Sequence, residues 1–265
     1  DRHAEGTEYR YFEGNKTAFA LLDYDTYFKA LNAAQLMGTV GTTAGTVNFM
    51  VDHRKTPSLS IRNALAGAST SSVDALLQTM SFNSLRELAL ARTATSNMGQ
   101  IGITVPLSTK WQAGGDFRLT NTTGLQASGT TALEGILPAT PGRGTEKTVT
   151  GQIIGSSLYI EGDIWSGSIT MNTSSAVSGR SIYLYNHTQF QSGWAMDTSL
   201  QLYRQKDQFG SDMSRNSPMV RGAYRIKEQF YFDVDLGYEF TSNKGAQQVT
   251  EMKRYFYSAG LRWDF

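Results

Sequence analysis

The stretch MKRYFYSAGLRWDF, residues 252–265, decides the fold predicted for this chain. Counted back from its end, every second residue is apolar, and most are aromatic: Phe265, Trp263, Leu261, Ala259, Tyr257 and Tyr255. The residues between them are small, polar or charged, with Phe256 as the exception: Asp264, Arg262, Gly260, Ser258 and Arg254. Side chains alternate between the two faces of a strand, so the pattern predicts a β-strand with one apolar, aromatic face and one polar face.

The same alternation recurs along the chain. The clearest further strands are predicted at residues 47–54, 100–107, 111–120, 164–173, 194–202 and 229–240, and less regular ones at 17–28, 30–40, 149–160, 180–190 and 220–226. Another strand fits residues 8–14, unless 8–28 form one long strand or an upstream strand is missing. Segments of about ten residues with alternating polarity are typical of membrane barrels. We therefore predict an all-β fold, an antiparallel up-and-down transmembrane β-barrel of about 12–14 strands, as a single domain over residues 1–265.

The predicted connections alternate between tight and long. The tight ones lie at residues 41–45, 108–110, 161–163, 191–193 and 227–228; the long ones cover 56–97, 124–147, 205–216 and 242–251, with 174–179 shorter. Outer-membrane barrels have short periplasmic turns and longer external loops. This pattern, and an aromatic residue at the end of the final strand, favour the outer membrane of a Gram-negative bacterium over a soluble sandwich.

Composition agrees with this class and excludes several others. No apolar run approaches the roughly 18 residues of a membrane-spanning helix, and 40% hydrophobic content suits strands that meet lipid at every second residue. The chain has no Cys and only 3 His, without paired His spacing, so we expect no metal site and no cofactor. A net charge of +1 gives no reason to expect nucleic acid as a partner.

Residues 57–96 interrupt the strand pattern and predict short helices. Val73, Leu76, Leu77 and Met80 have helical spacing, Ser84–Glu87 has the form of a capping box, and residues 59–65 fit a further turn of helix. Amphipathic helices between strands must bury their apolar side. They could plug the lumen, cap its mouth, contact a partner, or form an external loop with a small core of its own.

Two sets of side chains are candidate site residues. The polar faces of the strands carry charges of both signs, which would line a lumen or form cross-strand ion pairs: Asp52, Arg54, Asp116, Arg118, Asp197, Arg221, Arg225, Asp233, Asp235, Glu239, Arg254 and Arg262. Aromatic residues at strand ends predict lipid-interface girdles, with sugar stacking as the alternative: Trp111, Trp165, Trp194, Phe230, Tyr238, Tyr257, Trp263 and Phe265. No motif places His3, His53 or His187 beside a nucleophile, so we expect no enzyme activity.

The general layout resembles bacterial outer-membrane barrels. More narrowly, DHRKTP at 52–57, RNAL at 62–65 and LALARTA at 88–94 are similar to the C-terminal barrel region of large envelope proteins with tetratricopeptide repeats, although this chain has no such repeats. Some relatives of that layout export exopolysaccharide. The alternation of the strands and the asymmetry of their connections predict a channel or export conduit for a polar solute, gated or narrowed by residues 57–96, and the resemblance adds a polymer such as a polysaccharide as a candidate cargo. The alternative is a filled barrel that acts as a membrane anchor or interaction module for a surface or periplasmic partner, for which the loop 124–147 would provide contacts.

Overall fold

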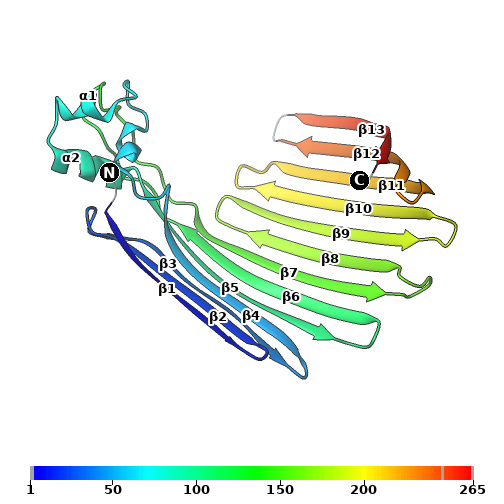
Figure 1. Ribbon diagram of the computed structural model, residues 1–265. Helices are drawn as coiled ribbons and strands as arrows, with labels where there is room; N and C mark the ends of the chain where they lie inside the picture. The colour runs from blue at the N-terminus through cyan, green and yellow to red at the C-terminus, as the bar shows by residue number, and fades with distance from the viewer. Residues whose placement is uncertain (1–2, 246–247, 264–265) are drawn as a thin grey trace. The chain divides into compact units, whose positions relative to one another are not determined.

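The computed structural model describes residues 3–245 and 248–263, and these residues form an antiparallel all-β fold. Thirteen strands follow one another in sequence order, each beside its neighbour in the chain (Figure 1). They are β1 (Ala4–Glu13), β2 (Lys16–Asp25), β3 (Ala30–Thr42), β4 (Gly45–Thr56), β5 (Ala94–Pro106), β6 (Trp111–Thr122), β7 (Gly144–Ser156), β8 (Ile164–Thr173), β9 (Val177–Gln189), β10 (Trp194–Asp207), β11 (Asp212–Lys227), β12 (Phe230–Lys244) and β13 (Val249–Trp263). Among the described residues, no helix is long and apolar enough to cross a membrane.

The chain divides into two compact units. The first unit comprises residues 1–101 and 118–147, and the second unit comprises residues 102–117 and 148–265. The predicted antiparallel all-β class is confirmed, with thirteen strands among the described residues.

The first two strands correct one expectation. Residues 8–28 are not one long strand, because the chain reverses at Gly14 and Asn15. Gly14 has a φ of +56°, a left-handed conformation that glycine adopts without steric cost. β1 and β2 then pair along their whole length, from Ala4 opposite Asp25 to Glu13 opposite Lys16.

Two of the predicted long loops are wrong. β10 and β11 continue through most of residues 205–216, and β12 and β13 continue through most of 242–251, so that only residues 208–211 and 245–248 connect them. These strand ends are polar on both faces, so the sequence alternation disappears there while the backbone pairing continues. The predicted strand at 149–160 ends early, at Ser156, because the next residue, Ser157, has a φ of +53°. Among the described residues, the long connections are therefore 57–93 and 123–143.

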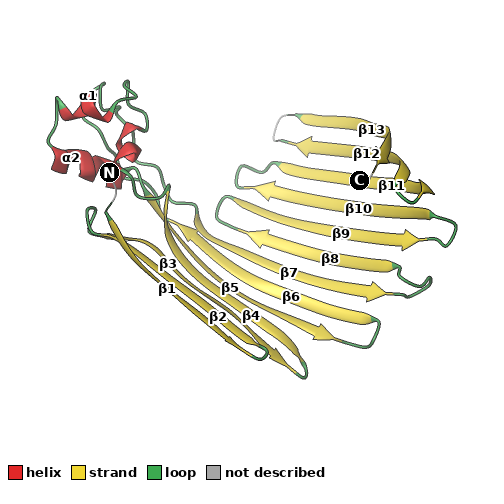
Figure 2. Cartoon of the chain, viewed as in Figure 1, coloured by secondary structure: helices red, strands yellow, loops and turns green. Residues whose placement is uncertain are grey.

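The helices that the structure describes lie between β4 and β5 (Figure 2). They are η1 (Ile61–Leu65), α1 (Val73–Leu77) and α2 (Phe82–Ala91), with Ser60, Ser72 and Ser81 as N-caps. The predicted start of a helix at Ser84 is wrong. The Ser81 hydroxyl accepts the Ser84 N–H at 3.2 Å, so Ser81 caps α2 and Ser84 is already inside the helix.

This helical insert has a small core of its own. It is formed by buried apolar residues of the insert together with one from the β2–β3 connection: Phe28, Leu59, Ile61, Ala64, Leu76, Leu85, Leu88 and Ala89. Tyr27 and Leu133 pack against it. The insert is therefore seated on the β2–β3 connection, residues 26–29, and on the long loop 123–143.

Arg92, the C-cap residue of α2, attaches that long loop to the insert. Its side chain is only 4% exposed, and its guanidinium donates to the carbonyls of Ala64, Glu134 and Gly135 and to the Ser128 hydroxyl. Burial lowers the pKa of Arg92, and the nearby Glu134 charge partly opposes that effect. We call this contact the Arg92 clamp.

Candidate functional site

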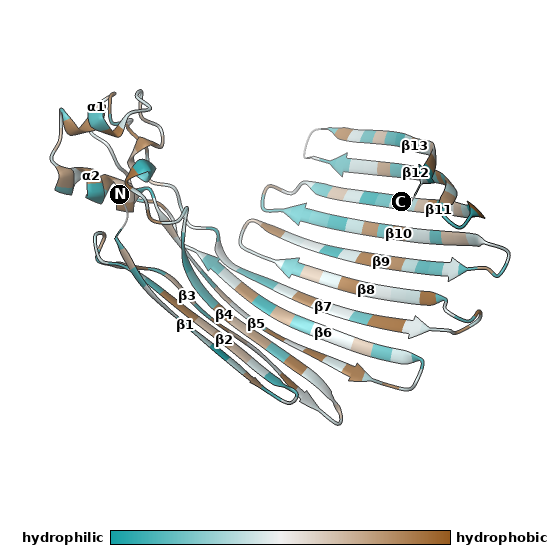
Figure 3. Cartoon of the chain, viewed as in Figure 1, coloured by the Kyte–Doolittle hydropathy of each residue, from teal (hydrophilic) through white to brown (hydrophobic). Residues whose placement is uncertain are grey.

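Strands β8–β13, all in the second unit, have two chemically different faces. Directly opposed residues of antiparallel strands share a face, and the pairing aligns the apolar residues of neighbouring strands in rows. One row is Thr198, Val220, Leu236 and Tyr257; the next contains Leu200 and Leu184; a third contains Leu202, Ile182 and Ile169. The hydropathy colouring shows brown and white segments recurring along these strands (Figure 3). We call this side the apolar face and the other side the polar face.

Aromatic rings gather at two levels of the apolar face. At the tight-turn end, Trp194 lies 4.7 Å from Tyr224, and Phe230 meets Trp263 edge-to-face at 6.4 Å, measured between ring centroids. At the other level, Tyr238 lies 5.0 Å from Tyr255. Six of the predicted interface aromatics lie on this face: Trp165, Trp194, Phe230, Tyr238, Tyr257 and Trp263. Tyr224 was not predicted, because its strand alternates less cleanly in the sequence.

Charged residues lie at one end of the apolar face, so the height of its apolar band can be calculated. Along β10 the band begins at Trp194 and ends at Leu202, and Arg204 and Lys206 follow on the same face. The eight residue steps from Trp194 to Leu202 extend about 27 Å along a strand. With the strand tilt of about 40° found in membrane barrels, this is a height of about 21 Å, and the charge of Arg204 follows near the roughly 25 Å at which their apolar bands end.

Polar groups on the apolar face bond to one another. Asn186 is buried; its amide donates to the Ile164 carbonyl at 3.2 Å, and its side-chain oxygen accepts from the Thr188 hydroxyl at 3.0 Å. A polar group without a partner would be costly next to hydrocarbon. These contacts make this part of the face compatible with a lipid environment.

On the polar face, charged and hydroxyl groups form a continuous belt across β9–β13. His187 Nδ1 lies 2.8 Å from Asp197 Oδ1, and the Tyr185 hydroxyl donates to the same oxygen at 2.7 Å. Arg221 is directly opposite Asp197, and its guanidinium lies 3.4 Å from Asp233 and 3.6 Å from Asp235. The Ser258 hydroxyl donates to Asp235 at 2.8 Å. We call these seven residues the polar belt.

The remaining predicted charges of β10–β13 flank the polar belt. Glu239 is directly opposite Arg254, Arg225 is opposite Tyr231, and the Arg262 guanidinium lies 4.6 Å from the centre of the Tyr231 ring. All eight predicted charges on β10–β13 thus share the polar face. This placement agrees with both predicted roles, lumen lining and cross-strand pairing.

The other predicted residues lie outside this constellation. In β4, Arg54 pairs with Asp52 at 2.6 Å. Asp116 and Arg118 are two residues apart in β6, so they share one face of that strand. The ring of Trp111 lies against Gly155, where a Cβ would come within 2.9 Å of it. Phe265 is outside the described residues.

His187, Tyr185 and Ser258 are members of the polar belt that sequence reasoning did not select. Each stands at a polar position of its strand, but only the register brings it to Asp197 or Asp235. The described residues place no serine, threonine or tyrosine hydroxyl within hydrogen-bond distance of His187 Nε2, and they contain no group of three or more potential metal-ligating side chains.

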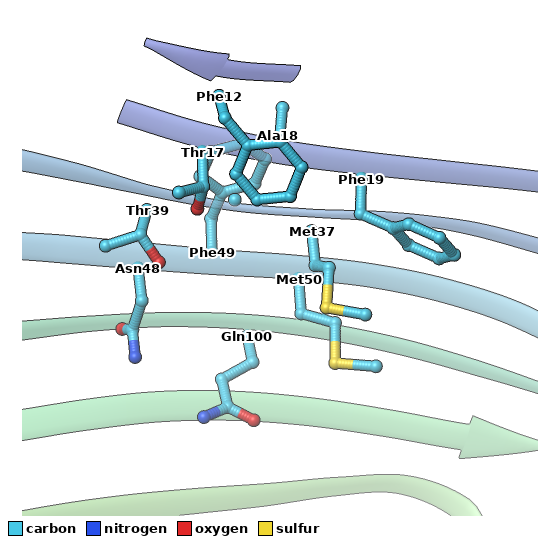
Figure 4. Close-up of a pocket in the computed structure, with 11 residues that line it drawn as sticks. Phe12, Thr17, Ala18, Phe19, Met37, Thr39, Asn48, Phe49, Met50 and Gln100 are labelled. Atoms are coloured by element: carbon cyan, nitrogen blue, oxygen red, sulfur yellow. The ribbon is translucent and has the colours of Figure 1, made fainter. Parts of the chain in front are cut away.

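A separate groove lies on one face of β1–β5 in the first unit, with a volume of about 320 Å³. Met37 of β3 is directly opposite Met50 of β4 and Phe19 of β2 (Figure 4). Phe12, Asn48 and Gln100 also line the groove. The face that carries Asp52 and Arg54 is therefore partly apolar at this level. Flexible methionines and rings can contact varied apolar groups.

Outer membrane proteins are among the solved structures to which this chain is similar. No protein-family model matches the chain, and no curated protein matches it. The in-vitro folded OmpT, an outer membrane protein of Vibrio cholerae, is 9% identical with a TM-score of 0.41, and the match covers 99% of this chain and 89% of that chain. A loop L8 deletion mutant of OmpT is 8% identical with a TM-score of 0.41, and the match covers 98% and 89%.

Proposed function

We propose that this chain forms an outer-membrane channel for polar solutes, in which the apolar face contacts hydrocarbon and the polar face borders water. The observation that carries the proposal is the two-faced register of β8–β13. Leu236, Tyr257 and Leu261 are 55%, 85% and 65% exposed on one continuous face. Soluble monomers rarely leave such a contiguous apolar surface in water, whereas a strand ladder with satisfied backbone groups suits a bilayer.

The proposal includes closure of the sheet into a barrel. In an antiparallel order of thirteen strands, β1 and β13 run in the same direction. Closure therefore requires either a parallel pairing of these strands or one additional strand. Bacterial single-chain barrels have even strand numbers, but a barrel of 19 strands exists in mitochondria.

The polar belt supports transport of polar solutes with weak charge selectivity. Together with the charges that flank it, the polar face of β10–β13 carries four carboxylates and four arginines, so neither sign dominates, whereas strongly selective pores carry one sign in excess. The carboxylates are Asp197, Asp233, Asp235 and Glu239, and the arginines are Arg221, Arg225, Arg254 and Arg262. A polymer such as a polysaccharide is a cargo suggested by the sequence resemblance around residues 52–57. We propose no catalytic role for this chain.

The helical insert is the proposed narrowing element. It has its own core, and the Arg92 clamp holds it to the loop 123–143. Both features suit a cap at one end of the strands. The same cap would suit the alternative function, a filled barrel whose loops bind a surface or periplasmic partner.

Reconstitution tests the proposal. The protein in detergent is mixed with vesicles of neutral phosphatidylcholine, floated on a density gradient, and recorded in planar bilayers of the same lipid. We expect co-flotation that resists carbonate washing and discrete conductance steps. Insertion without conductance would favour the filled-barrel alternative. A monodisperse protein in detergent-free buffer that does not float would refute the membrane assignment.

A further inference from the structure

Two arginines face each other at the charged end of the apolar face. Arg180 of β9 and Arg204 of β10 are directly opposed, and Lys206 follows two residues later on the same face. Like charges directly opposite each other destabilise a strand pair. Within the described parts of the chain, no carboxylate lies within 4.0 Å of either guanidinium, and the Lys206 ammonium lies 3.9 Å from the partly buried carboxylate of Asp212.

The cations line a groove. Its volume is about 470 Å³, and Arg180, Arg204 and Lys206 share its wall with Met171, Thr173 and Ser178. Met171 is directly opposite Arg180, so one row of the sheet passes from a thioether to two guanidiniums. Asp212, the carboxylate near Lys206, also lines the groove, so hydroxyl groups and an apolar group surround three cations and one carboxylate, and among the described residues the two arginines have no carboxylate within 4.0 Å.

The groove borders the apolar band. The adjacent row of the same face contains Ile169, Ile182 and Leu202, and the row after it contains Leu184 and Leu200. A molecule whose anionic group occupied the groove would place any attached hydrocarbon along these rows.

We propose that Arg180, Arg204 and Lys206 bind the phosphate of an anionic lipid headgroup. Guanidinium groups match the geometry of phosphate oxygens and bind them bidentately, and a bridging phosphate removes the repulsion between the opposed arginines. Basic pockets on membrane proteins bind lipid headgroups in the same way. The apolar rows select a lipid over a free anion, because they offer contacts that inorganic phosphate cannot use. This inference rests on the proposed function, in which the apolar face meets the bilayer.

The test uses the full chain in neutral detergent micelles. Dioleoyl phosphatidic acid, dioleoyl phosphatidylcholine and inorganic phosphate are titrated separately, and binding is followed by tryptophan fluorescence and by native mass spectrometry. The test variant is Arg180→Gln with Arg204→Gln. The matched control is Lys244→Gln with Lys253→Gln, which removes the same charge from the same end of the sheet, where Lys244 faces Asp212 and Lys253 faces Phe240.

We expect phosphatidic acid to bind the wild type, and the arginine variant to bind it about thirty-fold more weakly, from the typical contribution of each basic residue near a membrane surface. The lysine control should retain most of the affinity, and inorganic phosphate should bind far more weakly than the lipid. Equal losses in both variants would reduce the effect to net charge and overturn the site. Equally tight binding of inorganic phosphate would overturn the assignment to a lipid.

Flotation with neutral vesicles separates this inference from the proposed function. If wild type and arginine variant both insert but bind phosphatidic acid equally, the lipid site fails while the membrane assignment stands. If the wild type does not insert, the proposed function fails first. Charge-retaining Arg180→Lys and Arg204→Lys variants check that a loss is not misfolding: they should fold and bind with intermediate affinity.

Discussion

Replacement of Arg92 by Met should release the loop 123–143 from the helical insert. Met fills part of the space of the arginine stem, but it donates no hydrogen bonds. The carbonyls of Ala64, Glu134 and Gly135 would each lose a charged donor. A buried acceptor without a partner costs about 1–3 kcal/mol. Because the released loop regains water, we take the lower value for each carbonyl, which gives about 3 kcal/mol, or about 150-fold in the opening equilibrium of the loop.

Hydrogen–deuterium exchange measures this opening directly. The loop has its own short ladder, in which Ser128 and Leu137 exchange N–H to carbonyl bonds of 3.0 and 2.8 Å. We expect the amides of these residues to lose up to about 150-fold of protection in Arg92→Met. Amides in β9–β13 should keep theirs.

Two further variants sharpen the test. Arg62→Met removes an exposed arginine from η1 in the same insert and should leave exchange unchanged. Gly135→Ala should mimic Arg92→Met, because its Cβ would lie 2.1 Å from the Gly67 carbonyl oxygen at a residue with a φ of +78°. Protection in Arg92→Met within about threefold of the wild type, about 0.7 kcal/mol, would refute the clamp.

Three other outcomes follow from the structure. Leu200→Arg should destabilise the reconstituted protein by about 2–4 kcal/mol, because a cation would enter the middle of the apolar band. Gln201→Arg, at the same depth on the polar face, should destabilise it little. Equal losses of stability for the two variants, measured by urea unfolding from vesicles, would contradict the assignment of the faces. Arg221→Gln should raise the cation-to-anion permeability ratio about fivefold, since a unit charge about 4 Å from a passing ion contributes about 1 kcal/mol in water. An unchanged reversal potential in a salt gradient would show that ions do not pass the polar belt. Burial acts to raise the pKa of Asp163, but hydrogen bonds from the Leu158, Tyr159 and Ile160 amides and from the Trp165 indole lower this pKa overall. The ionised carboxylate therefore stabilises the folded turn fully above the ordinary pKa of 3.8, and this stabilisation is lost as the pH falls through the lowered pKa. Amide exchange of residues 158–160 should show that acid loss in the wild type and show it much reduced in Asp163→Asn.

The existence of most strands could be read from the sequence. Where one face of a strand is apolar, the period of two is visible in the residues themselves, and residues 164–173 became β8 with the predicted bounds. The same signal fails where both faces are polar. For this reason the outer parts of β10–β13 were predicted as loops, although their backbones continue to pair.

Helix positions were predicted more accurately than helix starts. The apolar spacing in residues 57–96 indicates helices, but Ser81 and Ser84 are both suitable caps in sequence terms. The choice of Ser81 depends on where α2 must begin to bury Leu85 and Leu88 in the insert core.

By itself, the sequence determined the two-faced strands, the helical insert and the separation of charged from aromatic residues, because these properties depend on neighbours along the chain. Only the tertiary structure decided which residues meet. His187 reaches Asp197, Arg180 faces Arg204, and Arg92 reaches Gly135 through strand register and loop packing. Register depends on pairing between segments that are distant in sequence, and a shift of one residue would move every side chain to the other face.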